Sequence, residues 1–471
     1  MCGIIAVLRR REQSDPVSPS VIDEWLDAAC RAVAPGEQNW NGALERLAEA
    51  ATFLQRMNES LLGSAGLRCM IEHPGLTERL EVSLTELEQR IVSLESALDA
   101  GEKALSALTV ESINSAIIRV KDALWAVRND RVRNSRAVAD LAGPDPGPAA
   151  LDGYASIQTA LSALDRLEVR GRDSAGLHVL VSGHGLELES PKIRAMLEPG
   201  LSNRLFTSGA VRTPAGQLGF VYKAAAEIGE LGDNGAELRR AIRGDALLRL
   251  ALGGENASAA VLGHTRWASV GFVSQANAHP LNQEELDQEP GSEAMPFVTA
   301  VLNGDVDNHA DLEAHEALRI PPEITTDAKV IPVLVSRRLA AGRSLEDAFR
   351  QTVASFEGSV AIAAQAALDP ERLLLALHGS GQALYVGLGR ESFIVASEPY
   401  GVIEECSTYL RMDGERPGNP DHPSASRGQI IVLDRGQAGR VGGIRRMAYD
   451  GTELPVEARD LTGADITTRD I

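Results

Sequence analysis

Apolar residues recur every three or four positions between residues 80 and 127, and this spacing restricts that stretch to packed helices. Such a period places the apolar side chains on one face of a helix, so the pattern predicts two antiparallel heptad helices. Weaker patterns at 21–33 and 44–61 predict further helices that would complete a small bundle. The heptad positions are Leu80, Leu84, Leu87, Ile91, Leu94 and Leu98, followed by Ile113, Ile117, Val120, Leu124 and Val127. Heptads specify packing and no chemistry, so we interpret this region as a scaffold or a partner surface.

The helical stretch is flanked by sequence of a different kind. Before it, Ile4–Leu8 has the apolar character of a β-strand. After it, Gly143–Pro148 consists of Gly, Pro and Asp, which interrupt helices and strands. We therefore predict an all-α insertion at 11–148 within a domain made of residues 1–10 and 149–450, followed by a C-terminal linker at 451–471.

The rest of the chain mixes helical and strand patterns. Helices are predicted at 154–167 and 236–252, and a strand at 177–181. From residue 298 onward, short apolar runs alternate with Gly, Asp and Pro, which is typical of consecutive antiparallel strands. These runs lie at 298–302, 359–364, 373–378, 383–387, 393–396, 430–433 and 441–447.

The charge of the chain narrows the partners that it can bind. With 46 Lys and Arg against 66 Asp and Glu, the formal net charge is −20, and no basic block offsets it. This balance argues against nucleic acid or an anionic membrane as partner and favours a small molecule or a protein. No run of about 18 apolar residues occurs, and the start lacks a signal-peptide pattern, so we expect a cytoplasmic protein.

Cysteine usage singles out one residue. The four cysteines are Cys2, Cys30, Cys69 and Cys406, and they form no C-x-x-C pair. No His stands at metal-ligand spacing, so no metal site is expected, and we interpret the last three cysteines as buried or incidental. Removal of Met1 would give Cys2 both a thiol and a free α-amine that can act as its base. The alternative is that Cys2 has no catalytic role and only precedes an ordinary strand.

Three later segments carry polar residues that suit an amino-acid ligand. Arg266 supplies a planar fork of donors for a carboxylate, and Trp267 beside it a rigid wall. Asn303-Gly304 is ordinarily a turn, but its side-chain and backbone N–H groups can also stabilise an oxyanion. Asp327 opens a helix, where an acidic residue either caps the helix or binds an ammonium group. We interpret His279 as a structural hydrogen-bonding residue and not as a catalyst.

Taken together, Cys2-Gly3-Ile4, Thr326-Asp327 and the segments 170–176, 263–271, 277–281 and 303–308 resemble the class II glutamine amidotransferases. Within that class, His264–Ala268 is similar to the glutaminase domain of glucosamine-6-phosphate synthase. The resemblance implies an α+β fold of the N-terminal-nucleophile hydrolase type. In that fold two stacked antiparallel sheets lie between helical layers (αββα), here with a large helical insertion.

The resemblance also implies the catalytic residues. Cys2 would be the nucleophile and, through its amine, the base, while Asn303 and Gly304 would form the oxyanion hole. No cofactor is implied. Leu302 stands where the family commonly has a His before Asn-Gly.

The substrate implied is L-glutamine. Arg266 would bind its α-carboxylate and Asp327 its α-ammonium group, with Trp267 and Ser269 lining the pocket. Val270 replaces the His that family members usually have at this point of the Arg-Trp segment.

The function implied is hydrolysis of the glutamine amide through a Cys2 thioester, giving glutamate and ammonia for aminosugar synthesis. The synthase family continues into two phosphosugar-isomerase domains that bind fructose 6-phosphate, and nothing here resembles them, so we expect the acceptor domain in the same or another chain. One alternative is a glutaminase that feeds a different acceptor. Another is a non-catalytic assembly or regulatory protein built on the helical insertion. The sequence leaves the oligomeric state, including a homo-oligomer, open.

Overall fold

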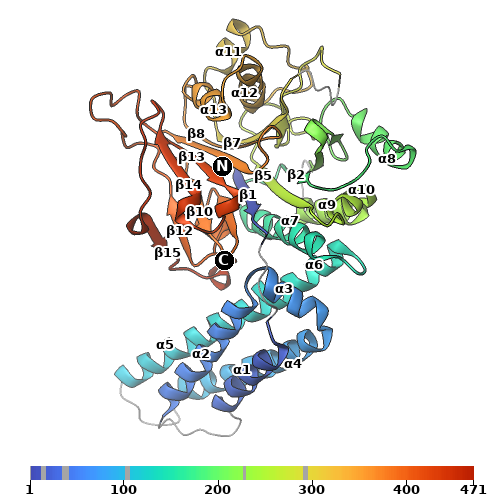
Figure 1. Ribbon diagram of the computed structural model, residues 1–471. Coiled ribbons are helices and arrows are strands. Elements are labelled where there is room, and N and C mark those ends of the chain that lie inside the picture. Colours follow the sequence, from blue (N-terminus) through green and yellow to red (C-terminus); the bar gives the residue numbers. More distant parts are fainter. Residues whose placement is uncertain (1, 12–16, 34–41, 101–106, 226–229, 290–294) are drawn as a thin grey trace. The chain divides into compact units, whose positions relative to one another are not determined.

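The computed structural model describes residues 2–11, 17–33, 42–100, 107–225, 230–289 and 295–471 (Figure 1). The chain divides into two compact units. The larger unit comprises Met1–Arg11 and Leu141–Ala464, and the smaller unit comprises Glu12–Asp140 and Asp465–Ile471. The chain therefore passes from the larger unit into the smaller one twice.

A nine-stranded sheet in the larger unit contains the first strand at its centre, in the order β15-β12-β10-β11-β1-β5-β2-β4-β3. The bounds are β1 (Gly3–Arg9), β2 (Ser174–Ser182), β3 (Val211–Arg212), β4 (Leu218–Ala224), β5 (Ser258–Arg266), β10 (Tyr385–Leu388), β11 (Ser392–Ala396), β12 (Thr408–Arg411) and β15 (Leu461–Gly463). β1 pairs antiparallel with β5 and β11, and all of its residues are buried. Both faces of β1 are covered, which explains why Ile4–Leu8 is apolar throughout instead of alternating.

A six-stranded sheet, in the order β14-β13-β9-β8-β7-β6, forms the second β-structure of this unit. Its strands are β6 (Leu281–Asn282), β7 (Val298–Gly304), β8 (Val360–Ala366), β9 (Arg372–His378), β13 (Gln429–Asp434) and β14 (Ile444–Ala448). On one face, alternate residues such as Ala300 and Ile362 pack against α12 (Val330–Ala340) and α13 (Leu345–Val353). Each of the runs predicted from residue 298 onward overlaps a strand of this sheet or the first.

The two sheets share an apolar core. Ile4 and Leu262 from the nine-stranded sheet lie in one buried cluster with Val301 and Leu375 from the six-stranded sheet. On the other face of β1, helix α7 (Pro148–Leu167) packs against β1 and β5. Two antiparallel sheets and their packed helices agree with the predicted α+β class.

The stretch between α7 and β5 differs from the prediction. Its helices are α8 (Pro191–Leu201), α9 (Asp233–Gly244) and α10 (Ala246–Leu252), and α11 (His309–His315) follows later. The single helix predicted at 236–252 is wrong, because the chain breaks at Asp245. The Asp245 carboxylate accepts the backbone N–H of Leu248 at 2.9 Å and so caps the start of α10.

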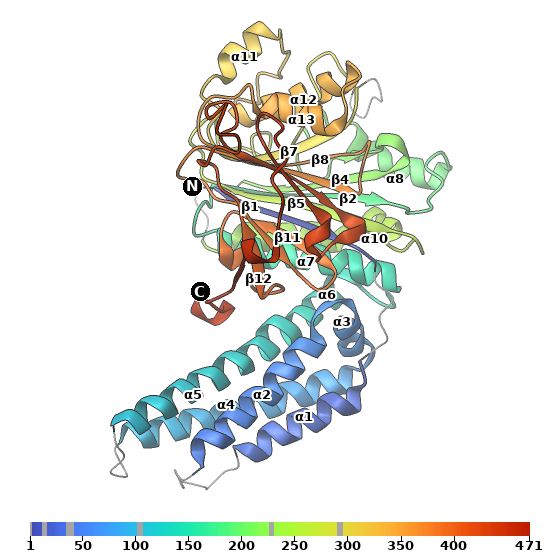
Figure 2. The same cartoon turned by 60° about the vertical axis from the view of Figure 1, so that its left-hand side comes forward.

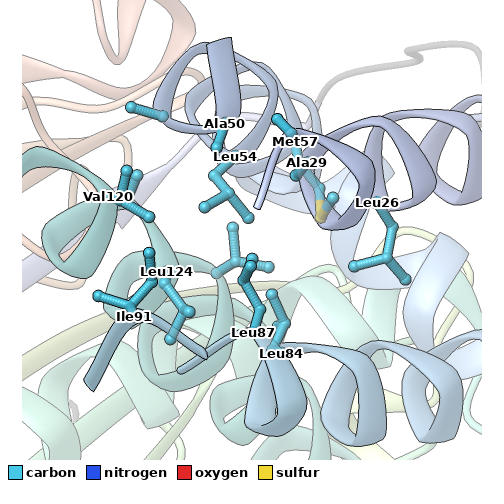
Figure 3. Packing of buried hydrophobic residues seen from close by; sticks show 14 of the residues in the cluster. Leu26, Ala29, Ala50, Leu54, Met57, Leu84, Leu87, Ile91, Val120 and Leu124 are labelled. Carbon is cyan, nitrogen blue, oxygen red and sulfur yellow. The ribbon is translucent and has the colours of Figure 1, made fainter. Parts of the chain in front are cut away.

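The smaller unit is helical, and the heptad residues form its core. Its elements are α1 (Pro19–Ala32), α2 (Ala43–Leu61), α3 (Gly63–Glu72), α4 (Pro74–Asp99), α5 (Ala107–Trp125), the π-helix η1 (Ala126–Arg133) and most of α6 (Asn134–Ala142). Helices α1, α2, α4 and α5 lie side by side (Figure 2). Leu84, Leu87 and Ile91 of α4 meet Val120 and Leu124 of α5 in the buried cluster drawn in Figure 3. The heptad spacing therefore identified the packed faces of these helices.

Residues 451–471, which the sequence suggested as a linker, take part in both units. β15 pairs with β12 in the nine-stranded sheet. Beyond it, Thr468 lies within the smaller unit, where its hydroxyl accepts the Trp125 Nε1–H at 3.0 Å and lies 2.8 Å from each carboxylate oxygen of Asp130. Polar, acidic composition alone did not reveal these contacts.

The part of the chain that the structure describes contains no helix long and apolar enough to cross a membrane.

Candidate active site

Cys2 lies at the start of the central strand β1. Gly3 pairs with Thr265 of β5, and its backbone is closely surrounded. A Cβ atom at residue 3 would come within 2.5 Å of Thr265 Oγ1 and 2.7 Å of Leu167 Cβ, so only glycine fits without displacing α7 or β5. The local packing thus fixes the position at which Cys2 emerges from the sheet.

Both the backbone nitrogen and the thiol of Cys2 have polar neighbours. The nitrogen donates to Asn303 Oδ1 at 3.2 Å, across a sequence separation of 301 residues. The thiol sulfur accepts the Trp267 backbone N–H at 3.4 Å and lies 3.5 Å from the Trp267 carbonyl oxygen. β1, β5 and β7 therefore bring Cys2, Trp267 and Asn303 together.

The surroundings of Cys2 keep its thiol protonated to higher pH. Burial raises the pKa of the Cys2 thiol, and the charge of Asp305 acts in the same direction. The hydrogen bond from Trp267 and the positive charge of Arg266 oppose this rise in pKa. A raised pKa means less thiolate at neutral pH, so formation of the reactive thiolate depends more on a nearby base.

Asn303 and Gly304 end β7, beside Cys2. Because Asn303 Oδ1 accepts from the Cys2 nitrogen, its Nδ2 group is the donor end, and within the described ranges Nδ2 makes no hydrogen bond. Gly304 has φ +119°, and a Cβ there would overlap the Ser359 carbonyl oxygen of the neighbouring strand. Both features suit a donor pair facing a ligand, with glycine required at the second position.

Arg266 ends β5 and organises the loop that follows. Its Nη1 donates to the Phe272 carbonyl oxygen at 2.9 Å, and Nη2 donates to the carbonyl oxygen of Val270. Burial lowers the pKa of Arg266, while the neighbouring Cys2 and Asp327 raise it. The guanidinium therefore holds the 267–272 loop, while the charges of Cys2 and Asp327 favour its protonated form.

The side chains of this loop differ in exposure. Trp267 is 59% exposed and Phe272 is 75% exposed. The Ser269 hydroxyl donates to Asp305 Oδ1 at 2.8 Å, which connects the loop to the residue that follows Gly304. The loop is thus attached at its base by Arg266 and at its middle by Ser269.

Asp327 contacts the chain just beyond the end of β7. Its Oδ2 accepts the Val306 backbone N–H at 2.7 Å. Burial raises the pKa of Asp327, the Val306 hydrogen bond lowers it, and the negative charge of Asp305 raises it. Asp327 is thus a buried carboxylate held close to the end of β7.

Three polar residues of the site were not singled out from the sequence. Asp173 Oδ2 accepts the Ala268 N–H at 2.8 Å, and Asp305 binds Ser269. Asn277 Oδ1 accepts the backbone N–H groups of Thr325 at 2.7 Å and Thr326 at 3.1 Å, which orders the chain before Asp327. All three lie within the segments 170–176, 277–281 and 303–308 that resemble the family, and this position is the sequence signal that could have identified them.

His279 is buried and hydrogen-bonded, in keeping with its interpretation as structural. Its Nδ1 accepts the Leu302 N–H at 3.3 Å, and its ring lies 4.3 Å from that of His264. Burial lowers the pKa of His279 well below its usual value, so the ring is neutral. Over the described ranges, no group of His, Cys, Asp and Glu side chains is arranged to hold a metal ion.

Comparison with known proteins gives sequence relatives but no match to a protein-family model. The glutamine–fructose-6-phosphate aminotransferase (isomerizing) of Geobacillus kaustophilus is 29% identical over 266 residues, which cover 56% of this chain and 34% of that protein. The protein of the same name from Halalkalibacterium halodurans is 32% identical over 154 residues, or 33% of this chain and 24% of that protein. This chain is similar to glutamine amidotransferases. The match confirms the resemblance inferred from its motifs.

The amidotransferase-like chain matches only about a third or less of the length of these relatives. Among solved structures, the glutamine phosphoribosylpyrophosphate amidotransferase of B. subtilis matches 62% of this chain and 47% of its own, at 18% identity and a TM-score of 0.38. The inference of function therefore uses the sequence relatives and the geometry around Cys2, and not this structural match.

Proposed function

We propose that this chain is a glutamine amidotransferase subunit or domain that hydrolyses the amide of L-glutamine to glutamate and ammonia. The observation that carries the proposal is the 3.2 Å contact between the Cys2 nitrogen and Asn303 Oδ1. It supports the proposal because Cys2 would supply the nucleophile and, through this nitrogen, the base, while Asn303 would supply an oxyanion donor beside them. The named relatives are enzymes that use glutamine, which supports the same assignment. Release of glutamate from glutamine by the purified chain is the direct test.

The reaction follows from these positions. After removal of Met1, the Cys2 α-amine takes the thiol proton, and Sγ attacks the amide carbon of glutamine. Asn303 Nδ2 and the Gly304 N–H hold the oxygen as it becomes negative. The intermediate collapses to a γ-glutamyl thioester while the proton passes from the amine to the leaving ammonia. Water then attacks the thioester, releasing glutamate and restoring the thiol.

The substrate would be held through its α-carbon groups. Arg266 would bind the α-carboxylate with donors not used by the loop, and Asp327 would bind the α-ammonium group. Trp267 and Ser269 would line the pocket. The charge of Arg266 lowers the pKa of Cys2, and the charges of Cys2 and Asp327 raise the pKa of Arg266, which supports a single pocket.

We further propose that the larger unit has the αββα layering of N-terminal-nucleophile hydrolases and that the helical region is an insertion into it. The shared cluster of the two sheets, α7 on β1 and β5, and α12 and α13 on the second sheet support this layering. The ammonia acceptor would be a phosphosugar-isomerase domain in the same or another chain, and the product an aminosugar phosphate. A different acceptor remains the alternative.

Replacement of Asn303 by alanine is expected to lower kcat by about 10²–10³-fold and to change KM little. The Nδ2 donor is needed when charge develops on the oxygen, and this is the usual loss for one oxyanion donor. Steady-state glutamate release measures both constants. A rise confined to KM would show that Asn303 binds the ground state and is not part of an oxyanion hole.

The KM for glutamine is expected to rise as pH falls, beginning above the pH range in which an ordinary aspartate titrates. Burial raises the pKa of Asp327, so its carboxylate is protonated sooner and loses its attraction for the ammonium group. Asp327→Asn keeps the size and the acceptor for Val306 and should give a high KM without this acid limb. Asp305→Asn removes a like charge and should move the limb to lower pH. An acid limb unchanged in Asp327→Asn would contradict the assignment.

Deletion of residues 12–140 and 465–471, with a flexible linker joining residues 11 and 141, is expected to leave a folded and active larger unit. The two sheets and their helices have cores separate from that of the smaller unit. Circular dichroism and glutamate release would check this. An unfolded product would show that the helical region is part of the folding unit and not an insertion.

A further inference from the structure

A row of polar side chains crosses the six-stranded sheet on the face turned toward the other sheet. Asn282 of β6 pairs with Thr299 of β7, and Thr299 pairs with Gln365 of β8. Thr299 Oγ1 lies 3.3 Å from Nδ1 of His178 in β2, which shows that the row faces the nine-stranded sheet. The next positions of β7 and β8 on this face are apolar, with Val301, Ala361 and Ala363 in the shared cluster. The polar row is therefore a local departure within the core.

Lys223 of β4 reaches the same region from the opposite sheet. It is fully buried, and its Nζ lies 5.4 Å from the centre of the Phe206 ring. His178 lies 6.1 Å from that ring, centre to centre. Burial lowers the pKa of His178 to about 3, and the nearby Gln365 and Lys223 act on it in opposite directions. Lys223, His178 and Gln365 are thus neighbours across the two sheets.

Several of these buried groups lack a hydrogen-bond partner. Within the ranges that the structure describes, no hydrogen bond of normal geometry is made by Lys223 Nζ or Asn282 Nδ2. The contact between Gln365 and His178 raises the pKa of His178, but it does not reach that geometry, and both amide atoms of Gln365 and His178 Nε2 stay without another partner. Each residue is at most 3% exposed. A buried polar group without a partner typically costs about 1–3 kcal/mol, so a cluster of them in one place calls for a ligand or water.

The charges in this region favour an anion over water. This region holds three cations that are at most 1% exposed: Arg212, Lys223 and Lys329. Glu284 binds Arg212 through both carboxylate oxygens at 2.5 and 2.7 Å. Lys329 donates to the carbonyl and the side-chain oxygen of Asn282, both of which are neutral. Glu284 and Glu285 also act on Lys329 and raise its pKa. Burial and the charge of Lys329 lower the pKa of Lys223 well below its usual value, and no carboxylate of the described residues opposes this fall. An anion beside Lys223 would favour its charged form, whereas a water molecule carries no charge to do so.

We propose that Lys223, with the side-chain amides of Asn282 and Gln365, binds a small monovalent anion of the halide class between β4 and β6–β8. The ammonium group supplies the charge, and the amide N–H groups supply neutral donors from the facing sheet. Full burial of these side chains favours a compact ion over an oxyanion with many acceptors. The site does not depend on the proposed glutaminase chemistry, since no residue of the candidate active site takes part.

The test is the thermal stability of the full chain in sodium chloride or bromide against sodium gluconate at the same concentration. A ligand that binds only the folded state raises Tm, and we expect a rise of about 2–4 °C in the halides. Lys223→Met should abolish this increment, whatever its effect on the baseline Tm, because removal of a buried cation can itself stabilise a core. Lys192→Met, which changes an exposed lysine at the start of α8, should keep it.

Two further measurements keep the proposal open to refutation. Gln365→Leu, which is close in size, should reduce the increment and serves if Lys223→Met does not fold. In crystals grown with bromide, anomalous scattering should place an ion between β4 and β8. Equal Tm values in halide and gluconate for the unmodified chain would overturn the proposal, as would an undiminished increment in Lys223→Met or bromide bound at the surface only. Those outcomes would indicate a neutral Lys223 solvated by water.

Discussion

Cys2→Ala is expected to abolish glutamate release, with kcat/KM lower by about 10⁴-fold or more, while the chain stays folded. The thiol forms the bond to substrate, and no other cysteine of the described chain lies beside Asn303. The side chain is small and lies at the start of β1, so its loss should shift Tm by only a few degrees, roughly the effect of an ordinary surface substitution. Glutamate release and thermal unfolding should be measured on the same preparation.

Cys30→Ala is the matched control for this variant. Cys30 is a half-buried thiol on α1 of the smaller unit, so its loss tests the effect of removing a cysteine away from the site. We expect this variant to retain full activity. Turnover by Cys2→Ala at the rate of the unmodified chain would remove Cys2 from the mechanism altogether.

Retention of an N-terminal extension is expected to lower kcat by about 10²–10⁴-fold, the usual contribution of a general base. An amide nitrogen at residue 2 has no basicity, and the raised pKa of the thiol leaves little thiolate to react without a base. The same extension followed by a protease site that releases Cys2 itself provides the control. Activity should appear on cleavage, in step with the mass of the processed chain.

An uncleaved form as active as the processed form would contradict the assignment of the α-amine. Another group would then have to accept the thiol proton. His264 and His279 both contact the backbone of Leu302, one residue before Asn303, but both are buried, and burial lowers their pKa values far below neutral. Neither ring is placed to touch the thiol in the described contacts.

The helical part of the fold could be predicted because its signal is local. The heptad leucines of α4 and α5 repeat at a fixed period, and Pro74 stands at the first position of α4, where a proline is tolerated. The break at Asp245 was missed because the apolar pattern continues through it, while the cap that starts α10 depends on a single carboxylate. The sequence did not indicate β4, because the pattern of residues 182–258 differs little from that of loops. Its assignment depends on pairing with β2 across more than 35 residues.

The candidate site was predictable where residues are recognised by type and order. Cys2, Arg266, Asn303 and Asp327 fall in segments that resemble a family, and the structure brings them together. The bond between Ser269 and Asp305 could not be foreseen, because it joins side chains 36 residues apart whose meeting depends on the β5 and β7 geometry. Arg266 was expected only as a ligand clamp. Its bonds to the carbonyl oxygens of Val270 and Phe272 show that it also orders the loop.

Labelling by a glutamine-like electrophile such as diazo-oxo-norleucine tests the central proposal most directly. The processed chain is treated with the reagent, digested and examined by mass spectrometry, with and without excess glutamine. We predict one label per chain, located on Cys2, formed more slowly when glutamine is present and absent in Cys2→Ala. No label on Cys2, or labelling of Cys2 and Cys30 alike that glutamine does not slow, would contradict a glutamine-binding nucleophile at this site.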